Sequence, residues 1–437
     1  MAALDAQGIK DLVRPDRVHR SVYTDPALFD LEMERIFGRA WLILGHESQV
    51  RHPGDFFTTR MGPRPVIVTR HTDGSVRVLE NRCAHRGARV CEAPSGHASQ
   101  LVCPYHGWTY GTDGSLRAVP IPDGYERPLT GTSDAGLARV SRVDTYRGFV
   151  FASLAATGPA LPEFLGPLRG SFDDFVERAP EGELDVAGGV FKHAYDGNWK
   201  LVLENHNDAV HPAFVHASSI WAARQAPPAD GAYSEIGIRQ MLQNGAPPEV
   251  WEKTGLWVAP HGHSFMGDYH DDSRLVPALH HPAFADYRAA LERRLGREGA
   301  ARILGELRWN SIVYPSGSFM SQFRQLRIVH PLAVDRTVVY AYSFRLRGAP
   351  EQMWRDTVAF ANVVNGTGSP VLTDDLEVYE RTQHGLRAQG ADWVYLGRGE
   401  GADVPESDGT LRGRTGTSEI HIRNAFAAWL EYMTAEA

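Results

Sequence analysis

Apolar and polar residues follow two different periods along this chain. Residues 26–42 carry apolar side chains at helical spacing behind a proline, which predicts a helix near the start. Between about residues 55 and 155, apolar residues instead form short β-rich runs separated by Gly, Asp and Pro, such as RPVIVTRH, SVRVLEN and RGFVFASL. This stretch is therefore predicted to be a small all-β module.

The rest of the chain mixes both periods, after a Pro- and Gly-rich connection at residues 156–185. The pattern predicts a helix at 197–211, then two long strands at 316–331 and 336–348, then helices at 351–364, 373–386 and 417–433. An antiparallel sheet with helices on one side would accommodate these elements, so we expect an α+β fold.

Composition narrows the class of protein. A chain of 437 residues is too long for one ordinary core, so two domains are expected. The net charge of -8 argues against a nucleic-acid partner. The chain shows neither a secretory signal nor an apolar run of membrane-spanning length, so no membrane partner is expected. Three Cys do not make a disulfide framework, which favours a reducing, cytoplasmic location.

Residues 81–111 contain two closely spaced Cys–His pairs, Cys83 with His85 and Cys103 with His106. A structural zinc site would more often pair Cys with Cys and His with His, and chance clustering of buried residues is the simplest alternative. A [2Fe-2S] cluster with two thiolates on one iron and two imidazoles on the other needs this order. The motif C-x-H, seventeen residues, then C-x-x-H and Gly-Trp resembles a Rieske cluster site. Cys91, without a partner, is expected to be a small buried residue.

A second group of ligand-type residues lies at residues 198–219. Glu204, Asp208 and His211 stand at i, i+4 and i+7, which predicts one helical face. Pro212 separates His211 from His216, and a bend there would bring both imidazoles to one metal. An ordinary buried helix with solvated His is the alternative.

Two His need one carboxylate to complete the facial triad of a non-heme Fe(II) site. The candidates are Asp374 and Asp375 at the start of a predicted helix, where an N-capping role is the alternative.

Together these features resemble the large (alpha) subunit of the Rieske non-heme iron aromatic-ring-hydroxylating oxygenases, over nearly the whole chain. The resemblance implies that Cys83, His85, Cys103 and His106 bind the [2Fe-2S] cluster. It also implies that His211, His216 and Asp375 bind the mononuclear Fe(II). Three segments are implied: an N-terminal helical segment at 1–40 packing on the catalytic domain, a Rieske domain at 41–155, and a helix-grip-like catalytic domain with flanking helices at 156–437.

The resemblance also implies an activity and partners. The chain would be a terminal oxygenase that uses O2 and two electrons to cis-dihydroxylate an aromatic ring, in the bacterial cytoplasm. A ferredoxin or an NAD(P)H-dependent reductase would supply the electrons, because no nicotinamide or flavin site is visible. The family forms homotrimers, with or without a small beta subunit. Asp208 would bridge His106 of the neighbouring subunit to its own His211, local helix support being its alternative role.

The substrate pocket is implied less directly. The resemblance places six residues near the substrate: Asn205, Arg308, Asn310, Met320, Asn365 and Val371. Arg308 and Asn310 would share one strand face, and a pocket Arg would suit a carboxylate by charge-assisted hydrogen bonds. Arg324 and Arg327 compete for that role. The one-residue-shorter spacing from Asn205 to Asp208 resembles the aromatic-acid members of the family.

Two other functions stay open at this stage. One is a pure electron carrier whose downstream domain is a scaffold, and the other is a Rieske monooxygenase or demethylase. A His-rich segment at 261–272 is not expected to bind metal, because no second segment completes a ligand set.

Overall fold

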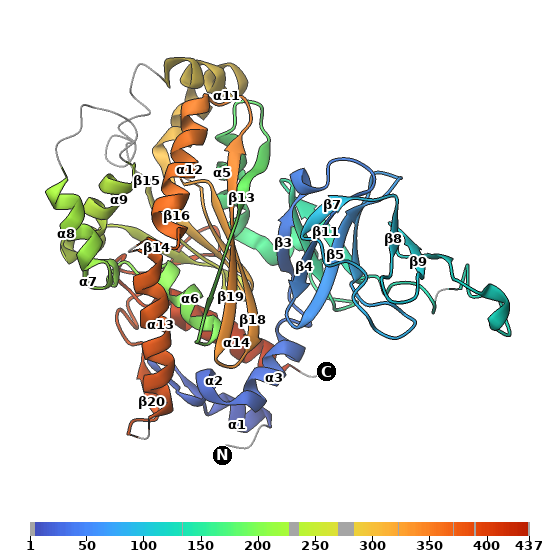
Figure 1. The fold of residues 1–437 in the computed structure, drawn as a ribbon. Helices are drawn as coiled ribbons and strands as arrows, with labels where there is room; N and C mark the ends of the chain where they lie inside the picture. Colours follow the sequence, from blue (N-terminus) through green and yellow to red (C-terminus); the bar gives the residue numbers. More distant parts are fainter. Residues whose placement is uncertain are drawn as a thin grey trace. The chain divides into compact units, whose positions relative to one another are not determined.

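The chain divides into two compact units in the computed structural model (Figure 1). The model describes residues 5–132, 134–226, 236–269, 284–321, 323–369, 371–388 and 390–435. One unit spans Phe37–Leu161 and is called the β unit here. The other combines Met1–Ile36 with Pro162–Ala437 and is called the α+β unit.

The β unit is built from three small antiparallel sheets, as the β-rich runs predict. Their strand orders are β6-β5-β4-β7, β10-β9-β8 and β11-β12-β3. The strands are β3 (Leu42–His46), β4 (Asp55–Met61), β5 (Arg64–Arg70), β6 (Val76–Glu80), β7 (Ser95–His97), β8 (Gln100–Val102), β9 (Thr109–Gly111), β10 (Leu116–Ala118), β11 (Arg142–Tyr146) and β12 (Phe149–Ser153).

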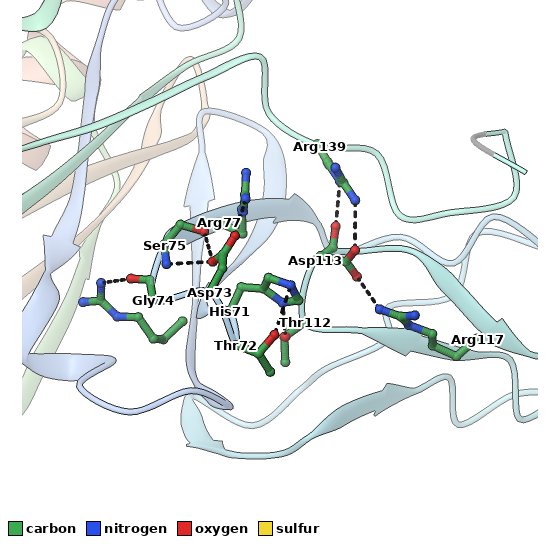
Figure 2. Close-up of polar contacts among 11 residues, drawn as sticks. His71, Thr72, Asp73, Gly74, Ser75, Arg77, Thr112, Asp113, Arg117 and Arg139 are labelled. Atoms are coloured by element: carbon green, nitrogen blue, oxygen red, sulfur yellow. Dashed lines mark hydrogen bonds and ion pairs between the residues drawn. The ribbon is translucent and has the colours of Figure 1, made fainter. Parts of the chain in front are cut away.

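Two hairpin turns of the β unit share the sequence Thr-Asp-Gly-Ser, around Asp73 between β5 and β6 and around Asp113 between β9 and β10. Each Asp carboxylate accepts hydrogen bonds from the backbone N–H and the hydroxyl of the serine two residues later. Figure 2 shows the two turns side by side, joined by a 2.7 Å hydrogen bond between His71 and Thr112. Arg139 also donates to Asp113. The paired turns therefore brace one end of the β unit.

The α+β unit contains an antiparallel sheet with the order β13-β19-β18-β17-β16-β15-β14-β22-β21. In that order the strands are Leu184–Tyr195, Arg336–Leu346, Gln325–Ala333, Gly317–Met320, Glu306–Val313, Ser264–Tyr269, Gly255–Val258, Leu411–Arg412 and Val404–Pro405. A separate small sheet joins β1 (Val13–Arg14), β2 (Arg17–His19) and β20 (Trp393–Tyr395).

The chain also contains the α-helices that flank these sheets. They are α1 (Ala6–Lys10), α2 (Ser21–Thr24), α3 (Pro26–Arg35), α4 (Leu161–Leu165), α5 (Arg169–Glu177), α6 (Trp199–His206), α7 (Pro212–Val215), α8 (Ala217–Gln225), α9 (Ile236–Asn244), α10 (Pro248–Trp251), α11 (Ala285–Gly305), α12 (Glu351–Asn365), α13 (Leu372–Arg387) and α14 (Ile420–Thr434). Within the described ranges, no helix has the length and apolar character of a membrane span.

Helices cover both faces of the large sheet. On β17, Phe319 packs against Phe172 and Phe175 of α5, with ring centroids 4.5 and 5.9 Å away. The preceding residue, Ser318, forms a hydrogen bond with His206 of α6. Because successive side chains of a strand point to opposite faces, α5 and α6 lie on opposite sides. The expectation that helices lie on one side only is therefore wrong. The face towards α6 is called the site face below.

The predicted single strand at 316–331 is two strands, β17 and β18. The chain turns between them, and Arg324 there adopts a left-handed backbone conformation with φ of 56°. Its guanidinium donates to Thr357 and to the carbonyl of Met353, both in α12. These tertiary contacts stabilise a break that the apolar pattern does not reveal.

Candidate functional site

The two Cys–His motifs form two loops with the same backbone hydrogen bonds. In each loop the Cys carbonyl accepts from the N–H of a Gly four residues later, at 2.9 Å for Cys83 and Gly87 and at 3.0 Å for Cys103 and Gly107. Both Gly residues have positive φ, 77° and 69°. Glycine adopts this conformation without the steric cost of a Cβ, so the loops can fold back tightly on each Cys.

The thiols of these loops point inward and the imidazoles lie at the surface. Cys83 and Cys103 are buried and free of disulfides, whereas His85 is exposed and His106 is partly exposed. The two imidazole centroids lie 4.7 Å apart, and Trp108 stacks on His85. Two inner thiolates and two outer imidazoles fit the donor set of a Rieske-type cluster. Cys91 is half-buried, and burial raises the pKa of its thiol.

In the α+β unit, the predicted helix at 197–211 ends early. Helix α6 stops at His206, and the carboxylate of Asp208 accepts hydrogen bonds from the backbone N–H groups of Val210 and His211, at 2.7 and 3.4 Å. A side chain that caps its own following backbone in this way competes with helix formation. The expected single helical face is therefore wrong. Glu204 accepts a hydrogen bond from Tyr23 instead, and burial raises the pKa of Glu204 to about 7.

His211, His216 and Asp375 converge on one point. The Nε2 atoms of His211 and His216 lie 3.7 and 3.5 Å from the same oxygen of Asp375, Oδ1. All three ligand atoms lie within 4.8 Å of one another. Two atoms held about 2.1 Å from one ion, at roughly tetrahedral angles, are themselves about 3.4 Å apart. The spacing is therefore too long for hydrogen bonds but suits ligands of one metal ion.

Other polar groups hold this triad in place. Asn205 donates to Oδ1 of Asp375 at 3.3 Å, and Oδ2 of Asp374 lies 3.7 Å from Nδ1 of His216. Neither Asp caps α13, because its N-cap is Val371, without a side-chain hydrogen bond. A carboxylate behind a metal-binding imidazole fixes the orientation of the ring. This contact of Asp374 with His216 was not predicted from the sequence, where only the adjacency of Asp374 to Asp375 pointed to it.

The triad is shielded from solvent. The side chains of His211, His216 and Asp375 are 18, 4 and 15% exposed. Desolvation lowers the pKa of His211, so its imidazole is neutral, as metal binding requires.

Three residues expected near the substrate lie around one apolar cluster beside the triad. The cluster contains Ala223, Met241, Met320, Phe323, Phe360, Val364 and Val371. Met320 and Val371 therefore lie in one cluster, and Val371 precedes α13, which carries Asp375. Asn365, at the end of α12, donates to Gln325 at 3.3 Å. A mostly apolar surface with few polar groups is typical of small-molecule sites.

Arg308 and Asn310 do not share a strand face. Asn310 donates to the carbonyl of His206 on the site face, at 2.6 Å. Arg308 lies 3.4 Å from Asp174 of α5, on the opposite side of the sheet. The register between β15 and β16 shifts at this point, and a bulge reverses the direction of the side chains on one side of it. The prediction of a shared face is therefore wrong, and Arg308 already has a carboxylate partner.

The His-rich segment is packed into the core where it is described. His263 is buried, forms a 3.0 Å hydrogen bond with the carbonyl of Phe164, and accepts from the backbone N–H of Tyr314. Burial lowers the pKa of His263 to about 3. His270 and the two residues after it lie outside the described residues.

The two donor sets are typical of one class of redox enzyme, which carries an iron–sulfur cluster and a separate mononuclear iron. Comparison with known families agrees. Residues 40–139 match the Rieske [2Fe-2S] domain, and residues 182–430 match the ring hydroxylating alpha subunit (catalytic domain).

Individual relatives are similar over most of their length. The chain is 34% identical to the 2-halobenzoate 1,2-dioxygenase large subunit of Burkholderia cepacia, over 88% of this chain and 80% of the relative. It is 34% identical to toluate 1,2-dioxygenase subunit alpha of Pseudomonas putida, over 89 and 83%. Naphthalene 1,2-dioxygenase with bound indole superposes with a TM-score of 0.80 at 27% identity, covering 96% of this chain and 92% of that one.

The chain belongs to the family of ring-hydroxylating oxygenase alpha subunits. It is thus a terminal oxygenase that hydroxylates aromatic rings, and its cofactors are a Rieske [2Fe-2S] cluster and a mononuclear iron.

Proposed function

We propose that this chain cis-dihydroxylates an aromatic ring beside an iron held by His211, His216 and Asp375. The observation that carries the proposal is the convergence of both imidazole Nε2 atoms on one oxygen of Asp375. A pure electron carrier would not need such a site. When bound, the iron supplies open coordination positions and the redox chemistry of dioxygen, and the cluster supplies single electrons. We assign the cluster to Cys83, His85, Cys103 and His106.

The protein's own groups position the reactants. Asn205 and Asp374 hold Asp375 and His216 in the orientation that metal binding needs. The apolar cluster around Met320, Phe360 and Val371 would hold the ring and exclude water. Asn310 and Asn365 each keep an amide oxygen that is buried and without a hydrogen bond in the described structure, and these oxygens would orient polar substituents.

Electrons would pass between subunits of a homotrimer, with or without a beta subunit, after delivery by a ferredoxin or a reductase. Asp208 is partly exposed, and in the described residues only its Oδ1 atom has hydrogen-bond partners. Its Oδ2 atom could therefore accept from His106 of a neighbouring subunit. Large apolar side chains are exposed close by in sequence to both residues: Phe214 after Asp208, and Tyr105 beside His106, at 72 and 58%. Exposed apolar surface of this kind often marks a protein interface.

The substrate is proposed to be an aromatic carboxylate. Two relatives with 34% identity are named for halobenzoate and toluate. A carboxylate bound in a mostly apolar pocket also needs a cationic partner.

Incubation with ¹⁸O2 tests the reaction type. The purified chain, a ferredoxin–reductase pair and a panel of benzoates should give a cis-diol carrying both labelled oxygen atoms. His211→Ala should abolish the product, whereas His384→Ala, an exposed His on α13, should not. One labelled atom in a phenol, or loss of a methyl group, would instead assign a monooxygenase or demethylase.

A further inference from the structure

Arg327 of β18 lies on the site face of the large sheet. It pairs in register with Ser318 of β17, whose hydroxyl is 2.7 Å from Nδ1 of His206. The pairing of β18 with β19 shows no irregularity from residue 325 to residue 331. Paired residues on neighbouring strands share a face, so Arg327 points towards α6. Gln325, two residues earlier on the same face, contacts Asn365.

The guanidinium of Arg327 has no partner within the described part of the chain. No hydrogen bond, ion pair or ring contact involves its side chain there. The two rival arginines are both satisfied: Arg324 donates to Thr357 of α12, and Arg308 pairs with Asp174. Arg327 is half-buried. A partly desolvated guanidinium without a protein partner is suited to bind an anionic ligand.

The electrostatic surroundings of Arg327 connect it to the triad. Desolvation lowers the pKa of Arg327, while nearby Tyr379 and Asp375 raise it. Burial, with the charge of Arg327 as the next cause, lowers the pKa of His206 and of His193, so both imidazoles stay neutral. Burial raises the pKa of Tyr379 well above its usual value, so its phenol is uncharged. Among the described residues, Asp375 is therefore the one negative group that acts on Arg327.

The charges around Arg327 favour an anionic ligand. In the proposed site the negative charge of Asp375 is shared with a divalent iron, so it offsets the positive charge of Arg327 only in part. Asp374 and Asp208 lie at His216 and at the backbone of His211, and neither is among the groups that shift the pKa of Arg327. Asp375, which the metal would share, is thus the carboxylate that acts on Arg327, and a monoanionic substrate would offset the remaining charge of the guanidinium.

We propose that Arg327 is the specificity-determining residue that binds the carboxylate of an aromatic acid while the ring lies against the apolar cluster. The inference rests on the proposed function, since it takes the triad as the iron site. A planar guanidinium can bind a carboxylate through two parallel hydrogen bonds. The substrate class is therefore a benzoate-type acid and not a neutral hydrocarbon.

Substrate binding tests the role directly. Isothermal titration calorimetry on the anaerobic holoenzyme would compare unsubstituted, methyl- and halogen-substituted benzoates with the corresponding amides. Arg327→Met should weaken benzoate binding about 10- to 100-fold, the expected loss for hydrogen bonds between charged groups. Amide binding should change less than about threefold. Arg327→Lys should recover part of the benzoate affinity, and iron content should stay unchanged.

Arg308→Met is the matched control, because it removes a guanidinium from the opposite face of the sheet. It should leave benzoate binding unaltered, and in steady-state assays Arg327→Met should raise KM with little change in kcat. If the wild type converts benzoates and Arg327→Met binds them as tightly as the wild type does, the role of Arg327 is refuted, while the proposed oxygenase function is retained. If the wild type binds no benzoate but oxidises neutral aromatics, the carboxylate substrate fails together with Arg327. If Arg327→Met misfolds, its circular dichroism spectrum will differ from that of the wild type. The comparison of benzoates with amides on the wild type would then decide whether the site prefers a carboxylate.

Discussion

Replacing Glu32 with Gln should weaken the packing of the N-terminal segment against the rest of the α+β unit. Glu32 of α3 is fully buried and accepts hydrogen bonds from Lys200, from Trp199 and from Trp429. These partners belong to α6 and α14, far away in sequence. Lys200 is 5% exposed, and desolvation lowers its pKa although Glu32 raises it.

The magnitude follows from the loss of charge compensation. A buried ion pair that loses one partner costs about 3–5 kcal/mol, because the remaining charge stays buried. Glu32→Gln should therefore lower the free energy of unfolding by about that amount in urea at pH 7, followed by tryptophan fluorescence. Glu34→Gln, an exposed position on the same helix, should cost less than about 0.5 kcal/mol.

A double variant separates charge compensation from packing. Glu32→Gln with Lys200→Met removes both charges and should be more stable than Glu32→Gln alone by at least about 1 kcal/mol. A cost for Glu32→Gln below about 1 kcal/mol would refute the argument. So would a double variant that is less stable than the single one.

Three further predictions concern the turns, the pH dependence and the electron path. Gly114→Ala should destabilise the β unit by at least about 1 kcal/mol more than Gly74→Ala, as measured by calorimetry. Both glycines have φ near 84°, but of the two only Gly114 has a neighbour that an added Cβ would meet, Leu79 at 2.9 Å. Equal melting temperatures of the two variants would contradict this. The pKa of Glu204 is raised to about 7, so the folded protein binds this proton more tightly than the unfolded chain does. The free energy of unfolding should therefore fall by about 3 kcal/mol as pH rises from 4.5 to 7. In denaturation at several pH values, Glu204→Gln should remove this pH dependence. Asp208→Ala should keep both metals but lose turnover, and a wild-type rate of cluster reoxidation in stopped flow would refute its bridging role.

The sequence predicts local features of this protein well. The two Cys–His loops, and the His pair around Pro212, depend on spacing within a few residues. Such spacing survives folding, since short loops hold their residues together. The two Asp at the start of α13 were the candidate carboxylates, and the structure brings one of them, Asp375, close to the His pair.

Features that depend on tertiary contacts were predicted less well. The bulge in β16 separates Arg308 from Asn310, and the turn made by Asp208 ends α6 before the expected point. The sequence offered three arginines for the carboxylate without a criterion to choose among them. Only the partners of Arg308 and Arg324, and the lack of one in the described residues for Arg327, distinguish them.

The most direct test of the two-metal account is the ratio of iron to acid-labile sulfide in anaerobically purified protein. The account predicts about three irons per two sulfides, falling to about two in His211→Ala with the Rieske-type EPR signal unchanged. His384→Ala should behave like the wild type. About two irons per two sulfides in the wild type after addition of Fe(II), or no loss of iron in His211→Ala, would contradict the assignment of His211, His216 and Asp375 as the iron site.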